Sequence, residues 1–111
     1  MGFEYRLEFP EPTWYRENRD RLAEYIRSLS SLKEELPTGE FRLRDDSQPN
    51  SWSYDLRIFL KLERVELEVS SRTSTLMVDV PAILSWIRRE TPVELVDDDG
   101  LPWEPIAAER K

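Results

Sequence analysis

The sequence predicts one α+β domain in which a mostly antiparallel sheet of about five to six strands carries two helices on one face. Segments with period-two alternation and segments with helical spacing follow one another in the order βαββββαβ, and a βαββαβ arrangement with one inserted strand also fits. The chain has 111 residues, 39% of them hydrophobic, so a single core is feasible. We expect residues 1–106 to form the domain and residues 107–111 to be a frayed tail.

The first strand and the first helix are predicted from side-chain spacing. Residues 3–9 alternate between apolar and charged side chains, which is typical of a half-buried strand, and Pro10 ends it. A helical region follows over residues 13–36, with Thr13 as a candidate N-cap. Its apolar residues recur at spacings of three and four: Tyr15, Leu22, Tyr25, Ile26, Leu29, Leu32 and Leu36. Serines at 28, 30 and 31 predict either a kink near residue 30 or a second short helix.

A hairpin is predicted in the middle of the chain, after a short strand at residues 41–43 and an exposed loop at 45–51. The apolar residues of 54–62 share one parity and those of 65–69 share the other. A two-residue turn at Glu63-Arg64 would bring them onto one face, with Leu62 opposite Val65 and Leu60 opposite Leu67. A slightly longer turn is the alternative, because Glu-Arg is not a favoured hairpin pair.

The last third of the chain predicts a strand, a helix, a strand and a turn. Residues 76–80 alternate, and Asp79 or Val80 begins a helix that has Pro81 in its first turn. A last strand is expected at 93–96, and an Asp-Gly turn closes it at 97–100. The segment after Gly100 could return along that strand, but its two prolines deny it a regular central position.

Composition excludes several kinds of chemistry. The chain has no cysteine and no histidine, so disulfides, thiolate nucleophiles, imidazole catalysis and imidazole metal sites are excluded. The N-terminus has no apolar signal core, and no apolar run approaches the roughly 18–20 residues of a membrane span. We therefore expect a soluble, cytoplasmic protein with no cofactor.

The negative charge is concentrated near the C-terminus. The net charge of −7 disfavours binding to nucleic acid or to an anionic membrane and favours a basic partner. Between Glu90 and Glu104 there are six acidic residues and no basic one, and Trp103 lies among them. The run from Asp97 to Asp99 invites a metal interpretation, but an Asp-Gly turn explains it better, since three consecutive side chains cannot easily converge on one ion.

Other candidate sites are weaker. Carboxylates at Asp45, Asp46, Glu63, Glu66 and Glu68 could form catalytic pairs, but they are expected on the solvated surface. Trp52 and Trp103 lie beside polar segments, and exposed tryptophans are common binding hot spots. The alternative is that both fold over the rim of the core.

These observations favour a noncatalytic acidic module that binds a basic protein, and a narrower version is an immunity- or antitoxin-like inhibitor of a basic effector. The candidate partner-binding residues are Trp103, Asp97, Asp98, Asp99, Glu94, Glu104 and Trp52. Two alternatives stay open: a small-ligand-binding or carboxylate-based enzyme domain, and a structural or oligomerisation domain. We expect a monomer or a weak homodimer.

Overall fold

The computed structural model describes residues 3–44, 54–70 and 78–102. Within them the element order is βαββββαβ, which confirms the predicted α+β fold. The elements are β1 (Phe3–Glu8), α1 (Pro12–Arg27), β2 (Leu32–Leu36), β3 (Glu40–Leu43), β4 (Leu56–Leu60), β5 (Val65–Val69), α2 (Val80–Arg88) and β6 (Glu94–Asp97).

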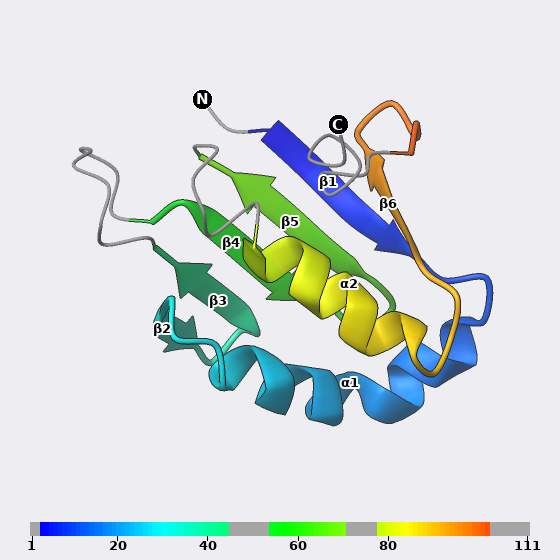
Figure 1. The fold of residues 1–111 in the computed structure, drawn as a ribbon, viewed down its shortest axis with the longest axis horizontal. Coiled ribbons are helices and arrows are strands. Elements are labelled where there is room, and N and C mark those ends of the chain that lie inside the picture. Colours follow the sequence, from blue (N-terminus) through cyan, green and yellow to red (C-terminus); the bar gives the residue numbers. More distant parts are fainter. Residues whose placement is uncertain (1–2, 45–53, 71–77, 103–111) are drawn as a thin grey trace.

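The strands form one six-stranded sheet in the order β2-β3-β4-β5-β1-β6 (Figure 1). Every neighbouring pair is antiparallel. Strands β2 to β5 form a meander, and β1 then lies between β5 and β6. The earliest and latest strands of the described chain are therefore side by side, with Glu8 opposite Glu94.

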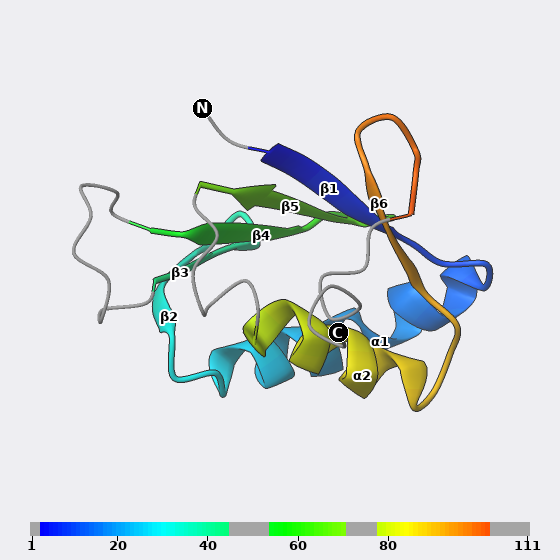
Figure 2. The ribbon, with the colours of Figure 1, turned by 45° about the horizontal axis from the view of Figure 1, so that its top comes forward.

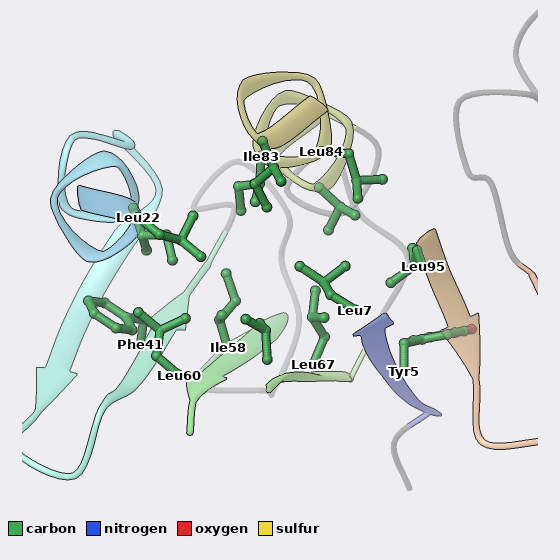
Figure 3. Close-up of a cluster of buried hydrophobic side chains, with 14 of the residues drawn as sticks. Tyr5, Leu7, Leu22, Phe41, Ile58, Leu60, Leu67, Ile83, Leu84 and Leu95 are labelled. Atoms are coloured by element: carbon green, nitrogen blue, oxygen red, sulfur yellow. The ribbon is translucent and has the colours of Figure 1, made fainter. Parts of the chain in front are cut away.

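Both helices pack on the same side of the sheet, while the turn after β6 projects on the other side (Figure 2). The core fills the space between the helices and the sheet (Figure 3). The alternation of apolar residues predicted which strand residues belong to this core, because every second residue of β4 and β5 is buried. The predicted stripe of α2, formed by Ile83, Leu84 and Ile87, is also buried.

The predicted helix at residues 31–36 is wrong, because β2 occupies this segment and pairs with β3. The four-residue spacing of Leu32 and Leu36 fits a helical turn and also fits two periods of a strand, so local pattern could not decide. The serine-rich stretch ends α1 at Arg27, as its poor helix propensity suggested. The predicted N-cap is also wrong, since α1 begins after Glu11 with a proline in its first turn.

The predicted strand at 76–80 is not found within the described residues. Val78 and Asp79 form a helical turn that leads into α2, and residues 76 and 77 lie outside the described ranges. The predicted loop at 45–51 and the predicted tail at 107–111 also lie outside the described ranges. The order βαββββαβ therefore holds because β2 replaces the strand expected later in the chain.

The hairpin of β4 and β5 has the predicted buried face but a different register. Leu60 lies opposite Val65 and Ile58 lies opposite Leu67, so the turn is centred on Leu62 and Glu63. The observed pairing moves each residue by two positions relative to its predicted partner. A shift of two keeps every side chain on the same face, so the apolar pattern is satisfied by both registers. Leu62 consequently lies in the turn and is 73% exposed.

Contacts from α1 distinguish the two registers. The hydroxyl of Tyr15 donates to the carbonyl of Lys61 at 2.5 Å and lies 3.3 Å from that of Arg64, so it joins the two ends of the turn. Arg19 donates to the carbonyl of Leu60 at 2.9 Å. The Tyr15 side chain is fully buried. These bonds to backbone carbonyls hold the turn at one position.

We expect Tyr15→Phe to lower the free energy of unfolding by about 1–2 kcal/mol, because the turn carbonyls lose a buried donor while the ring still fills its site. Urea unfolding measures this loss. Tyr25→Phe is the matched control, since the Tyr25 hydroxyl lies 3.4 Å from its acceptor, the carbonyl of Ala82. Equal losses in the two variants would contradict the assigned role of Tyr15.

The buried hydroxyl also predicts a dependence of stability on pH. Burial raises the pKa of Tyr15 from 10.0 to about 12, against a smaller opposing effect of Arg19. Between these pH values the unfolded chain binds fewer protons than the folded one, so the free energy of unfolding falls as pH rises. Below pH 10 the contribution is complete. Tyr15→Phe should lose less stability than the native chain between pH 9 and pH 11 in urea unfolding, and identical losses would refute the assignment.

Candidate functional site

The sheet face that the helices leave uncovered carries most of the charged strand residues, and we call it the open face. Its side chains alternate with the buried ones along β3, β4 and β5. Cross-strand register places seven glutamates and three arginines there: Glu4, Glu8, Glu34, Glu40, Glu66, Glu68, Glu94, Arg6, Arg42 and Arg57. These strand residues sum to −4, and Lys61 and Arg64, which pair with Glu66 on the same face, offset part of that charge.

Ion pairs neutralise the part of the open face over β3, β4 and β5. Arg57 pairs with Glu68 and reaches Glu40 at 3.4 Å. Arg42 pairs with Glu40 at 2.7 Å. Both guanidinium groups lie over the ring of Tyr54, at 5.4 Å for Arg42 and 4.9 Å for Arg57. Because these charges satisfy one another, this region offers little unpaired charge to a partner.

A concavity of about 310 Å³ lies on the open face between β1, β5 and the turn after β6. Glu66, in its wall, pairs with Lys61 at 3.1 Å and with Arg64 at 2.6 Å. Glu4 and Asp98 also line it, and neither makes an ion pair among residues 3–44, 54–70 and 78–102. Unpaired negative charge therefore collects at this end of β1.

A second concavity of about 630 Å³ adjoins the first, because Arg6 and Arg64 line both. It continues along β1 past Glu8 and includes Glu94 of β6. Glu8 pairs with Arg6 at 2.8 Å, whereas Glu94 is exposed and makes no ion pair in the described structure. Prolines, which cannot donate backbone hydrogen bonds, form part of its wall: Pro10, Pro12, Pro92 and Pro102.

The acidic run after β6 forms a turn. One carboxylate oxygen of Asp97 accepts the backbone amides of Asp99 and Leu101 at 3.0 and 2.9 Å. Gly100 has φ +83°, a conformation that glycine adopts readily. The three carboxylates approach within 4.8 Å of one another, but the bonds of Asp97 to the backbone account for its place without an ion.

Glu90 does not contribute free charge, although the sequence placed it in the acidic stretch. Arg21 donates two hydrogen bonds to its carboxylate at 2.9 and 2.7 Å, and the Trp14 indole donates another at 3.1 Å. These hydrogen bonds, chiefly those from Arg21, lower the pKa of Glu90 below its ordinary value. Arg21 also lies over the ring of Trp86. Glu90 therefore joins the two helices on the opposite side of the sheet from the open face.

The predicted site residues have different outcomes. Glu94, Asp98 and Asp99 are exposed, and Asp97 is half-buried in the turn. Trp52, Trp103 and Glu104 lie outside the described residues. Sequence patterns alone did not indicate that Glu4, Arg6 and Glu8 are neighbours of this region. Alternation could place them on the outer face of β1, but nothing local indicated that β1 pairs with β6.

Comparison with family models, with curated proteins and with solved structures gave no match. Neither of the helices in the described ranges has the length and apolar character needed to cross a membrane.

We expect Asp97→Ala to destabilise the turn, because the amides of Asp99 and Leu101 lose their acceptor, at a cost of about 1 kcal/mol. Asp97→Asn keeps a side-chain oxygen and should retain most of the stability. Amide hydrogen exchange at residues 99 and 101, with thermal unfolding, measures both effects. Asp98→Ala is the control and should change stability by less than about 0.5 kcal/mol. Fast exchange in the Asn variant as well would argue against the turn role.

Proposed function

We propose that this chain is a noncatalytic module that binds a basic protein partner at the β1–β6 end of the open face. The observation that carries the proposal is a set of acidic side chains there that make no ion pair within the part of the chain that the structure describes: Glu4, Glu94, Asp98 and Asp99. The neighbouring glutamates of β3 and β5 are paired. A partner can therefore bring positive charge to this end without first breaking internal ion pairs.

Charge and exposed apolar groups would have different roles in such binding. Unpaired surface charge steers a partner of opposite sign and speeds encounter, and it does so less at high salt. Affinity requires apolar contact as well. Leu62 and Leu101 are 73% and 61% exposed, and each is adjacent in sequence to a residue that lines the larger concavity. These two leucines supply apolar contact at the border of the acidic region.

Two glutamates of the described ranges, Glu35 and Glu90, have a pKa below the ordinary value, chiefly because of hydrogen bonds from Arg27 and Arg21. A general acid needs the opposite shift, which keeps a carboxyl group protonated near neutral pH. These two glutamates therefore do not have the character of a general acid.

The edge strand β2 offers little support for the oligomerisation alternative. Its central residues Lys33, Glu34 and Glu35 are charged and exposed. Charged side chains on an edge strand oppose pairing with another sheet.

A narrower form of the proposal is an immunity- or antitoxin-like inhibitor, and it rests on the small size and acidity of the chain. In this form the module covers the active site of its basic partner.

The test compares native bait with a Glu94→Gln/Asp98→Asn variant in capture from native lysate, followed by binding measurements on the purified basic protein that mass spectrometry identifies. We expect the variant to bind about tenfold more weakly, which corresponds to about 1.4 kcal/mol. Binding by the native chain should weaken as salt rises. Trp103→Ala, at the candidate partner-binding tryptophan, should also weaken binding.

The matched control is Glu17→Gln/Glu24→Gln, which removes the same charge from exposed positions of α1. If that control weakens binding as much as the open-face variant does, the effect is one of net charge and the site assignment fails. Capture of a partner whose binding ignores salt and both variants would refute the proposal.

A further inference from the structure

The smaller concavity of the open face, of about 310 Å³, has charges of opposite sign at its two ends. Cross-strand register arranges its lining in rows across the strands. One row places Glu4 opposite Glu68. The next outward row places Arg6 opposite Glu66. The other charged residues of the lining are Asp98, after β6, and Lys61 and Arg64, in the β4–β5 turn.

The end at the β4–β5 turn has an excess of positive charge. Lys61 and Arg64 both pair with Glu66, at 3.1 and 2.6 Å, so two cations share one carboxylate. The other carboxylate of this turn, Glu63, pairs with Arg16 of α1 at 3.4 Å. One of the two cations can therefore bind an external carboxylate while the other keeps Glu66 paired. Arg64 suits this role, because a guanidinium can bind both oxygens of a carboxylate.

The opposite end has an excess of negative charge. Glu68 is paired there with Arg57, whereas Glu4 and Asp98 make no ion pair in the described part of the chain. The pairing of β1 with β6 brings these two carboxylates to the same concavity, although they are far apart in sequence. An ammonium group has three hydrogen-bond donors, so it suits an end that offers more than one carboxylate.

A short extended chain can span the two ends. Four residues separate Glu68 from Arg64, which is about 13 Å at roughly 3.3 Å per residue. An extended peptide of three residues spans about 10 Å, and the long side chains at both ends can reach across the remainder. The half-buried Phe59 lies between the ends, because it is opposite Glu66 in the β4–β5 register. It supplies apolar contact to a chain that crosses the concavity.

We infer that this concavity binds a short peptide with free ends, which places its ammonium group at Glu4 and Asp98 and its carboxylate at Lys61 and Arg64. This role goes beyond the proposed function, because it gives the two cations of the turn a ligand. A free amino acid is too short for both ends, since its ammonium and carboxylate groups share one carbon. A ligand with two cationic ends would meet Lys61 and Arg64, and like charges repel.

The test uses the peptide Ala-Leu-Ala with free ends, with an acetylated N-terminus, with an amidated C-terminus and with both blocks. Titration of the ¹⁵N-labelled full chain at low salt gives the dissociation constants and the amides that shift. We expect each block to weaken binding about threefold, as the loss of one exposed ion pair does, and both blocks together about tenfold. Free alanine should bind no better than the doubly blocked peptide. The amides of residues 4–6, 64–68 and 98 should shift, and those of β2 should not.

Two charge-removing variants assign the ends of the peptide. Glu4→Gln/Asp98→Asn should remove the effect of acetylation and keep that of amidation, because only the ammonium end loses its partners. Lys61→Gln/Arg64→Gln should do the reverse. The matched control Glu17→Gln/Glu24→Gln, on exposed positions of α1, should keep both effects.

Equal binding of the free and blocked peptides overturns the inference, and so do shifts confined to residues outside the concavity. A variant that leaves both blocking effects intact overturns the assignment of that end. None of these results removes the proposed function, because salt-sensitive binding of a basic protein can still depend on Glu94, which does not line this concavity.

Discussion

One-sided burial is the constraint on which the rest of the structure depends. Both helices cover the same face of a six-stranded sheet, so the inner strands β1, β3, β4 and β5 place alternate residues in the core and on the outward face (Figures 2 and 3). The buried set is apolar with few exceptions. The outward set is free of packing requirements and can carry charge, which places many charged side chains on the open face.

The same constraint explains why the open face is not uniform. Over β3, β4 and β5 each strand has neighbours on both sides, and cross-strand pairs such as Arg57 with Glu68 neutralise one another. At the β1–β6 end, Glu8 and Glu94 are opposite each other and both are acidic. The cross-strand register thus separates a region whose charges pair with one another from a region that is acidic, and binding is proposed only for the second.

Contacts between the layers decided what alternation left open. A two-residue change of register in the β4–β5 hairpin keeps all apolar side chains buried, so the buried Tyr15 hydroxyl and its bond to the Lys61 carbonyl provide the discrimination. Likewise, the spacing of Leu32 and Leu36 is satisfied by helix and strand, and pairing with β3 selected the strand. In both cases two alternative arrangements satisfy the same apolar spacing, so local sequence could not distinguish between them.

By itself, the sequence determined the fold class, the buried face of each correctly assigned element, the Asp-Gly turn and the exclusion of histidine and cysteine chemistry, because these depend on composition and short-range periodicity. The tertiary structure decided strand order, the register of the hairpin and the partners of the charged side chains. It assigned Glu90 to Arg21 and brought Glu4 beside Asp98. Ion pairing depends on a few ångströms between residues far apart in the chain, and the packing of α1 beside α2 and the pairing of β1 with β6 set those distances.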